Sequence, residues 1–176
     1  ASIFKKMRAS IGVLNNMFNT LLDISKLDAN FDYVQNFFEL EALVRDVQIS
    51  FGQFAEDKGL SLTFEYQNCI VFGDANLMAQ VLRNLLSNSI QYTSAGQVRV
   101  RFWQEDRKLV FAVEDTGCGI PNEDLPFVYK EFFRSEHSRS HYDGLGLGLT
   151  IVSRVVDRIG GGISVESYVN KGTTFT

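Results

Sequence analysis

The stretch DGLGLGLTIVSRVVDRIGG, residues Asp143–Gly161, places three alternating glycines immediately before an amphipathic helix. Glycine inside a helix costs about 1 kcal/mol relative to alanine, so glycines at this point indicate a role for the backbone itself. Glycines ahead of a helix leave backbone N–H groups free to face an anion, and the N-terminus of a helix favours negative charge. The stretch lacks the Lys-Ser/Thr ending of a Walker-type loop and the context of a dinucleotide fold. It therefore predicts a phosphate-binding loop of another kind.

The apolar residues after the glycines recur with the period of a helix. They are Ile151, Val152, Val155, Val156 and Ile159. The alternative is a strand in which Leu145, Leu147 and Leu149 share one face and the glycines share the other. Because the helical period follows at once, we favour the helix.

Composition bounds the class of protein. The chain has 176 residues, is 45% hydrophobic and carries a net charge of −4, which argues against nucleic acid or an anionic membrane as the main partner. Cys69 and Cys118 lack the spacing of metal ligands and favour a reducing, cytoplasmic compartment. No apolar run approaches the roughly 20 residues of a membrane span. The chain starts at Ala and ends on an unfinished strand, so we expect a fragment whose parent has targeting segments or a membrane anchor elsewhere.

The remaining pattern predicts an α/β two-layer sandwich, in which a mixed, mostly antiparallel sheet has helices on one face. Helices are expected over Phe38–Gly59, over Asn76–Tyr92 with Asp74 as its cap, from Pro121 and after Gly148. Strands are expected over Leu60–Tyr66, Ile70–Gly73, Gln97–Gln104, Lys108–Asp115, Ile163–Tyr168 and Thr173–Thr176, with a polar turn over Glu105–Arg107. The polar run over residues 134–143 predicts a mobile loop.

Residues 1–30 differ from the rest of the chain. Their apolar residues form a narrow helical seam of Leu14, Met17, Leu21, Ile24 and Leu27. A lone helix of this length is marginal in water, so the seam needs a partner. The alternative is a helix packed on its own domain, but we favour a long N-terminal helix from a dimeric bundle, which predicts a homodimer.

Asp115 interrupts an apolar stripe. Leu109, Phe111 and Val113 share one face of the predicted strand, and Asp115 continues that face. A carboxylate there is costly unless something donates a hydrogen bond to it. Asp also commonly begins turns, which is the simpler explanation. However, Gly117 and Gly119 follow, where a chain can pass close to a ligand, so the slot suits an exocyclic amine such as that of adenine.

The helix over residues 76–92 has a polar edge beside its apolar arc. Asn84, Asn88 and Gln91 are spaced so that they project from one stripe. Asn is a mediocre helix former, and amide oxygens suit Mg²⁺ that also keeps water and phosphate oxygens. An ordinary solvated face is the alternative. Taken with the acid and the glycine loop, this edge predicts one cavity for adenine, Mg²⁺ and phosphates.

Four motifs in order resemble the N, G1, F and G2 boxes of the catalytic ATP-binding domain of sensor histidine kinases. They are NLLSNSIQYT (Asn84–Thr93), EDTGCGIP (Glu114–Pro121), EFFRSE (Glu131–Glu136) and GLGLGLTIV (Gly144–Val152). This domain is of the Bergerat type, in the superfamily shared with gyrase, Hsp90 and MutL. Residues 1–30 resemble, through LLDISKLDAN, the second helix of the dimerisation and histidine-phosphotransfer domain, and residues 31–176 the catalytic domain.

The resemblance implies a role for each matching residue. Asp115 would bind the adenine amine in a slot shaped by Gly117, Gly119 and Ile120, with Thr173 supporting it through water. Asn88 would be the Mg²⁺ ligand with Asn84 one turn earlier, and Gln91 and Tyr92 would lie along the nucleotide. Arg134 would reach the terminal phosphate, and residues 134–143 would form a lid. The phosphates would be lined by Gly144, Leu145, Gly146, Leu147 and Gly148.

The implied function is transfer of the ATP γ-phosphoryl group to a histidine of the parent homodimer, then to an aspartate of a response regulator. Asn84, Asn88 and Arg134 would be its catalytic residues. The chain departs from the family in two places: Gln91 stands where many members have Lys, and the two histidines, His137 and His141, lie in the predicted lid. The acceptor histidine is therefore expected upstream of Ala1.

Three other functions remain open from sequence. A gyrase-type ATPase usually has Glu where this chain has Asn84, and an amide is not a useful general base. A non-catalytic regulatory module is supported only by Gln91. A serine kinase of the anti-sigma type shares the nucleotide site, but the N-terminal seam favours the two-component kinase.

Overall fold

A computed structural model describes residues 34–135 and 145–176. The chain divides after Asp32, and Tyr33–Thr176 forms one compact unit. The predicted helix and dimer seam of residues 1–30 therefore lie outside the described residues, as do Gly144 and most of the predicted lid. Within the described residues, no helix is long and apolar enough to cross a membrane.

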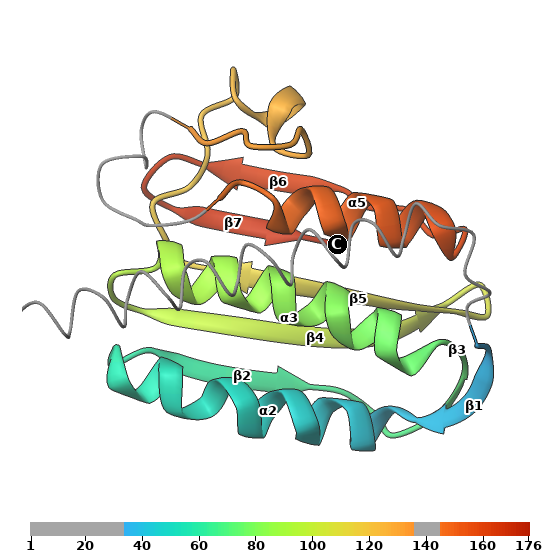
Figure 1. The fold of residues 1–176 in the computed structure, drawn as a ribbon. Coiled ribbons are helices and arrows are strands. Elements are labelled where there is room, and N and C mark those ends of the chain that lie inside the picture. The colour runs from blue at the N-terminus through green and yellow to red at the C-terminus, as the bar shows by residue number, and fades with distance from the viewer. Residues whose placement is uncertain (1–33, 136–144) are drawn as a thin grey trace, which may run out of the picture. The chain divides into compact units, whose positions relative to one another are not determined.

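A five-stranded mixed sheet forms one layer of the larger unit (Figure 1). In spatial order its strands are β2 (Ser61–Glu65), β4 (Gln97–Glu105), β5 (Lys108–Asp115), β7 (Gly172–Phe175) and β6 (Val165–Tyr168). The pair β2–β4 is parallel, and the other three pairs are antiparallel. The predicted mixed, mostly antiparallel sheet is confirmed.

Three helices cover the same face of this sheet: α2 (Leu40–Asp57), α3 (Ala75–Tyr92) and α5 (Gly148–Arg158) (Figure 1). Helix α3 packs between the other two, so its apolar arc is the centre of the core. Leu82 and Leu86 on this arc are fully buried, and burial of each such side chain stabilises the fold by about 1.5–3 kcal/mol. The predicted two-layer arrangement is therefore confirmed, and α3 is fixed firmly against the sheet.

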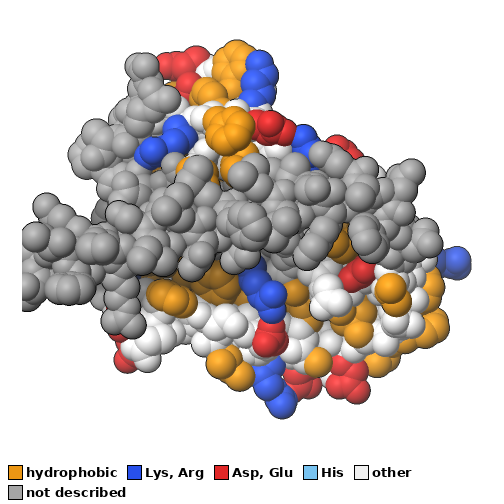
Figure 2. Space-filling view, viewed as in Figure 1, with side chains coloured by type: hydrophobic (Ala, Val, Ile, Leu, Met, Phe, Trp, Pro, Cys, Tyr) orange, Lys and Arg blue, Asp and Glu red, His pale blue; other side chains and the backbone are white. Residues whose placement is uncertain are grey.

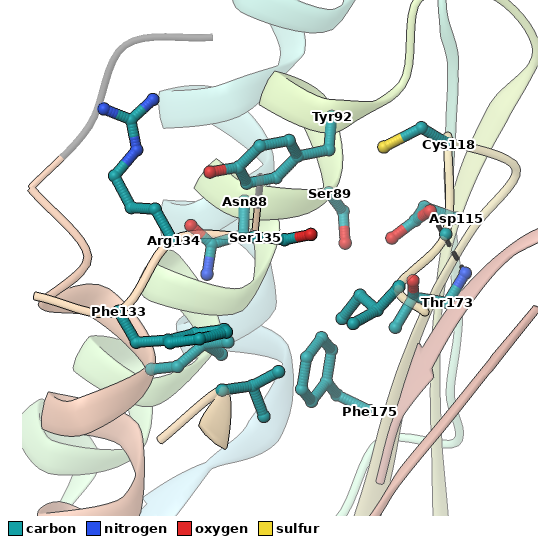
Figure 3. A pocket seen from close by; sticks show the side chains of 14 residues that line it. Asn88, Ser89, Tyr92, Asp115, Cys118, Phe133, Arg134, Ser135, Thr173 and Phe175 are labelled. Atoms are coloured by element: carbon teal, nitrogen blue, oxygen red, sulfur yellow. Dashed lines mark hydrogen bonds between the residues drawn. The ribbon is translucent and has the colours of Figure 1, made fainter. Parts of the chain in front are cut away.

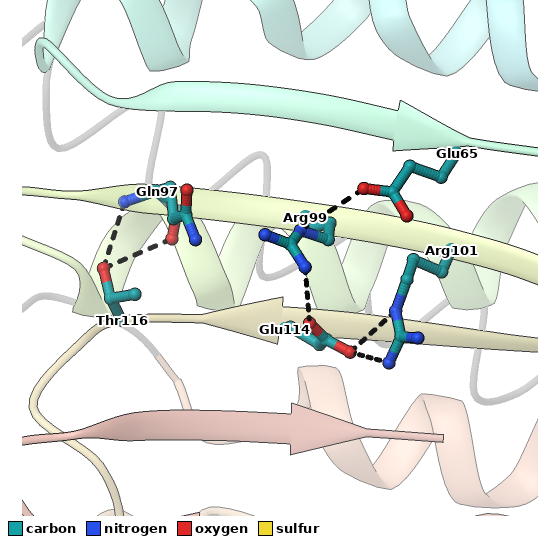
Figure 4. A network of polar contacts seen from close by, with 6 residues as sticks. All are labelled: Glu65, Gln97, Arg99, Arg101, Glu114 and Thr116. Atoms are coloured by element: carbon teal, nitrogen blue, oxygen red, sulfur yellow. Dashed lines mark hydrogen bonds and ion pairs between the residues drawn. The ribbon is translucent and has the colours of Figure 1, made fainter.

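The other face of the sheet carries a network of ion pairs (Figure 4). Arg99 of β4 lies 3.5 Å from a carboxylate oxygen of Glu65 and 3.9 Å from one of Glu114. Arg101 also donates to Glu114, through Nε at 2.9 Å. Since each of these side chains keeps contact with water, the network contributes little stability. It marks this face as polar, which leaves the core entirely on the helix side.

A second, two-stranded sheet was not predicted. β1 (Asn36–Glu39) pairs antiparallel with β3 (Ile70–Gly73), and Phe38 faces Val71 in the ladder. The expected helix start at Phe38 is therefore wrong: α2 begins at Leu40, whose N–H donates to Cys69 O at 3.0 Å. Because Phe38 is paired with Val71 in the β1–β3 ladder, its backbone is extended and cannot belong to the helix.

The outer face of the β1–β3 pair is apolar. The ring centroids of Phe37 and Phe72 lie 5.0 Å apart, and the two residues are 75% and 58% exposed, respectively. Figure 2 shows hydrophobic side chains at the surface toward the end of the unit that carries this pair. Apolar surface gathered in this way is more than the single exposed side chains found on most proteins.

Local sequence signals fix the ends of several elements. Asp74 caps α3 as predicted, because its Oδ1 accepts from the N–H groups of Asn76 at 2.9 Å and Leu77 at 3.1 Å. The expected turn between the two long strands also forms, since β4 ends at Glu105 and β5 begins at Lys108. The short helix expected from Pro121 begins later than predicted, as a 3₁₀ helix over Leu125–Phe127.

Candidate functional site

A pocket opens between the C-terminal half of α3, the loop after β5 and strand β7 (Figure 3). It encloses about 90 Å³, whereas a single water needs only about 10–15 Å³ on a comparable measure. Its walls include the predicted site residues Asn88, Tyr92, Asp115, Gly119, Ile120, Arg134 and Thr173. Residues distant in sequence thus meet in one cavity, as the sequence analysis expected.

Asp115 ends β5 at the floor of this pocket. Its Oδ1 accepts from Gly117 N at 2.9 Å and from Thr173 N at 3.2 Å. Burial raises the pKa of the carboxyl above its ordinary value, while these two N–H groups and the nearby Ser89 hydroxyl lower it. The two backbone donors hold the carboxyl in place by one oxygen, so the other oxygen can accept from a ligand.

Two buried hydroxyls lie beside Asp115 at the end of α3. Ser89 is 2% exposed and Thr93 is fully buried, and the Thr93 hydroxyl has no hydrogen-bond partner among the residues that the structure describes. The Ser89 hydroxyl lies near enough to the Asp115 carboxyl to lower its pKa, but it makes no hydrogen bond of good geometry within those residues. Figure 3 shows the Ser89 hydroxyl pointing toward Asp115. A buried polar group without a partner costs about 1–3 kcal/mol, so the Ser89 hydroxyl indicates that a polar ligand or water completes the pocket.

Asn88 and Tyr92 lie one turn apart on α3, which places both on the pocket wall. The Asn88 side chain is half-buried and makes no hydrogen bond within the described part of the chain. Its amide oxygen is therefore available to a cation or to water, and its amide nitrogen to an anion. Tyr92 places an aromatic ring beside Asn88 (Figure 3).

The loop after β5 packs closely on the end of α3. A Cβ atom at Gly117 would lie 2.5 Å from Tyr92 O and 3.0 Å from Thr93 Oγ1, so only glycine fits there. Next to it, Cys118 N donates to Tyr92 O at 3.2 Å. Gly117 thus contributes by backbone geometry and is not among the residues that line the pocket.

The glycine loop meets the segment before Arg134. Phe132 N donates to Gly146 O at 3.0 Å, and a Cβ atom at Gly146 would lie 2.5 Å from Phe133 O. Gly146 has φ +72°, which also favours glycine. Phe133 and Arg134 line the pocket, and the Arg134 guanidinium points away from Asp115 (Figure 3). The third and fourth of the four predicted motifs are therefore in contact.

Helix α5 begins beside the asparagines of α3. A Cβ atom at Gly148 would lie 3.3 Å from Asn84 Oδ1 and 3.7 Å from both terminal atoms of the Asn88 amide. The first turn of α5 brings Leu149 to the pocket wall. The positive end of the α5 dipole and its free N–H groups therefore lie close to Asn88, where an anion is favoured.

Several predicted site residues lie outside the pocket wall. Asn84 turns its amide nitrogen back to Gln80 O at 2.9 Å, and Leu147 is buried in the core. Those not among the described lining residues are Asn84, Gln91, Gly117, Leu145, Gly146, Leu147 and Gly148. The expected sharing of one cavity by Asp115 and Asn88 is met directly, while Gly146 reaches it only through Phe132 and Phe133.

Sequence reasoning missed part of the wall, which also includes Ser89, Cys118, Val128, Phe133, Ser135, Leu149 and Phe175. One signal for Ser89 was present. Ser89 follows Leu82, Leu85 and Leu86 on the apolar arc of α3, and a hydroxyl on such an arc is unusual. Cys118, Phe133, Ser135 and Leu149 lie within the four motifs but were not singled out there, and Val128 and Phe175 carried no distinguishing pattern.

Comparison with known proteins shows which family this chain resembles. The profile of the family described as Histidine kinase-, DNA gyrase B-, and HSP90-like ATPase matches residues 73–176. The sensor protein SrrB of Staphylococcus aureus (strain NCTC 8325 / PS 47) is 34% identical over 166 residues, covering 92% of this chain and 28% of SrrB. The chain thus spans less than a third of the length of this relative.

Solved structures agree in fold. The crystal structure of full-length ShkA in complex with AMPPNP is 26% identical, with a TM-score of 0.85 over 99% of this chain and 37% of ShkA. A nucleotide-free catalytic domain of the histidine kinase ThkA is 27% identical, with a TM-score of 0.70 over 81% of this chain and 92% of that domain.

Proposed function

The chain belongs to the histidine kinase-, DNA gyrase B- and HSP90-like ATPase family, and from this we propose that it is the ATP-binding catalytic part of a two-component sensor histidine kinase. Its chemistry is transfer of the ATP γ-phosphoryl group to a histidine of the parent protein. The phosphoryl group then passes to an aspartate in the receiver domain of a response regulator.

The half-buried Asp115 at the pocket floor carries this proposal. One carboxylate oxygen is held by Gly117 N and Thr173 N, so the other is left to accept from the exocyclic amine of adenine. Gly119 and Ile120 line the slot that the base would enter, and Tyr92 would lie along the nucleotide. A positioned acceptor in a mostly apolar slot discriminates among bases by which groups can donate to it.

The other end of the pocket fits phosphates and Mg²⁺. Asn88 offers a neutral amide oxygen, and the residues described include no group of three or more His, Cys, Asp or Glu that could hold a cation without it. The ion would supply neutralisation of the charge that develops on the phosphates. Arg134 and the backbone of the glycine loop, Gly144–Gly148, would hold the terminal phosphates.

Hydrolysis by a gyrase-type mechanism is less well supported. The position where such an enzyme needs a base to activate water is Asn84, whose amide nitrogen is bonded to Gln80 O. An amide cannot take a proton from water at neutral pH. Transfer to a positioned acceptor needs no such base in this domain, which favours the kinase.

The acceptor and the partners complete the proposal. The chain contains two histidines, His137 and His141, and we assign the acceptor to neither; it belongs to another part of the parent protein. Residues 1–30 would form half of the helical hairpin through which the parent dimerises. Because ATP and response regulators are cytoplasmic, we place this domain there, with any membrane anchor in the rest of the protein.

Titration calorimetry with ADP tests the base slot. Asp115→Asn should weaken ADP binding by about 10-fold or more, since one lost acceptor for the amine is worth about 1.4 kcal/mol or more. The side chain can keep its bonds from Gly117 N and Thr173 N, so the variant should remain folded.

Glu114→Gln is the matched control. Glu114 is the preceding acid on the same strand, but it faces the ion-pair network on the far side of the sheet. The Glu114→Gln variant should therefore bind ADP with unchanged affinity. Equal ADP affinity in the unaltered protein and in Asp115→Asn would contradict the proposed site. In the intact parent protein, radiolabelled ATP should yield phosphohistidine outside positions 137 and 141.

A further inference from the structure

Ser167 of β6 lies behind the pocket and bonds to three groups at once. Its hydroxyl accepts from Ile120 N at 2.8 Å, lies 3.1 Å from Gly172 O and lies 2.8 Å from Thr173 Oγ1. Ser167 is 4% exposed, so water does not compete for these bonds. It therefore joins the loop after β5 to the last strand of the sheet.

The number of protons decides how these bonds run. A serine hydroxyl has one proton to donate and two lone pairs to accept with. Gly172 O can only accept, so the single proton of Ser167 goes there. Ile120 N–H fills one lone pair of Ser167, and only the proton of Thr173 can fill the other. The arrangement that satisfies every buried group therefore has Thr173 donating to Ser167.

This direction fixes what Thr173 offers to the pocket. With its proton turned toward Ser167, Thr173 Oγ1 presents only lone pairs beside the Asp115 carboxyl, whose Oδ1 also accepts from Thr173 N. At this part of the pocket floor, the Thr173 hydroxyl oxygen and the Asp115 carboxylate therefore both act as hydrogen-bond acceptors toward a ligand. An amino group on the base satisfies such acceptors, while a carbonyl oxygen at the same place is repelled.

We propose that Ser167 is a specificity-determining positioning residue, which holds the Thr173 hydroxyl as an acceptor and thereby selects 6-amino over 6-oxo purine nucleotides. This inference rests on the proposed function, because it requires the base to enter the slot at Asp115. Ser167 itself does not line the pocket, so it acts through Thr173.

The test compares ADP with IDP, which carries a 6-oxo group in place of the amine. The unaltered protein should favour ADP by about 100-fold or more in titration calorimetry. In Ser167→Ala, Thr173 loses its acceptor and can turn its proton into the pocket. The ADP/IDP affinity ratio should therefore fall by at least about 10-fold. A merely structural defect would weaken both nucleotides together and leave the ratio unchanged.

A second set of variants guards against misfolding of the first. Thr173→Val removes the hydroxyl with little change of shape and should also lower the ADP/IDP ratio, whereas Thr173→Ser should keep it. Combining Ser167→Ala with Thr173→Val should lower the ratio no further than Thr173→Val alone. Thr174→Ala is the matched control, because Thr174 faces the polar side of the sheet opposite Glu114.

The outcomes separate the two proposals. An ADP/IDP ratio that is unchanged in both Ser167→Ala and Thr173→Val, while ADP still binds, overturns the role of Ser167 and leaves the proposed function standing. No binding of ADP by the folded, unaltered protein overturns both. A lowered ratio in both Ser167→Ala and Thr173→Val, with the Thr174→Ala ratio unchanged, supports the inference, whereas a lowered ratio in Thr173→Val alone overturns the role of Ser167.

Discussion

The Asp115 carboxyl is largely shielded from water but must be ionised to accept hydrogen bonds at both oxygens. Nucleotide binding should therefore be sensitive to pH. Burial raises its pKa above the ordinary value of 3.8, which the donors from Gly117, Ser89 and Thr173 offset only in part. The ionised form can accept at both carboxylate oxygens, from Gly117 N and Thr173 N at one and from the amine of the base at the other. As pH falls from neutral toward that ordinary value, Asp115 therefore gains its proton earlier than an exposed carboxyl would.

We expect ADP affinity to decrease progressively as the buffer is taken from neutral to weakly acidic pH. In Asp115→Asn this decrease should be absent, because the side chain no longer titrates. Calorimetric titrations of both proteins over the same pH series measure it. A decrease of equal slope in both proteins would assign the titration to another group, or to the phosphates of the ligand.

The same pKa shift predicts the sign of a stability effect in the protein without nucleotide. A carboxyl whose folded pKa is raised opposes folding once pH exceeds its unfolded pKa, and the cost is complete above the folded pKa. Asp115→Asn removes this cost at neutral pH. The variant that loses nucleotide affinity should consequently unfold no more easily than the original, which a thermal melt of the same samples shows.

At the scale of the element, the C-terminal end of α3 depends on a cation from another helix. The Lys58 ammonium donates to Ile90 O at 2.7 Å, Gln91 O at 2.9 Å and Thr93 O at 3.3 Å. The last carbonyls of a helix have no partner within it, and a positive charge there also complements the helix dipole. Lys58 therefore holds the turn that carries Asn88, Ser89 and Tyr92.

Lys58→Met should lower the free energy of unfolding by about 1–2 kcal/mol, because it removes charged hydrogen bonds from carbonyls that are partly shielded from water. ADP affinity should also fall several-fold, since the pocket wall loosens. Chemical denaturation and calorimetry measure the two effects. Lys108→Met, at an exposed position at the start of β5, is the control and should change neither quantity. Equal behaviour of the two variants would show that Lys58 does not stabilise α3.

Elements whose ends are set by neighbouring residues were predictable from sequence. The Asp74 cap and the turn at Glu105 are fixed within a few residues, and both form as expected. Strand β1 was not predictable, because Phe38 pairs with Val71 of β3, a residue far along the chain. The local pattern there continues the apolar period of α2, and only the partner strand decides against a helix.

The candidate site divides in the same way. Asp115 and Asn88 were found because each breaks the pattern of its own element. Lys58 and Ser167 were not, because their roles depend on partners 32 and 47 positions away, Ile90 and Ile120. A serine on a short strand and a lysine at a helix end are ordinary in sequence. Their function exists only once the sheet has brought the partners together.

At the scale of the whole molecule, the unit Tyr33–Thr176 contains its own core. Its fully buried side chains come from all three helices and from the central strands of the sheet. They include Leu40, Val44, Val47, Leu82, Leu86, Val98, Val100, Val113, Val152 and Val155. The polar network on the opposite face needs no cover. The helices therefore bury the apolar face of the sheet, and the polar face can remain in contact with water.

A chain that begins at Tyr33 should therefore fold cooperatively and bind ADP. We expect its melting temperature to lie within about 4 °C of that of the 176-residue chain, roughly the shift that 1 kcal/mol causes in a domain of this size. Its ADP affinity should agree within about 3-fold, because every residue that lines the described pocket lies after Tyr33. Calorimetric melts and titrations of the two chains decide the matter. A much lower melting temperature with unchanged affinity would mean that residues 1–32 add to the core, whereas a loss of affinity at unchanged stability would mean that they complete the nucleotide site.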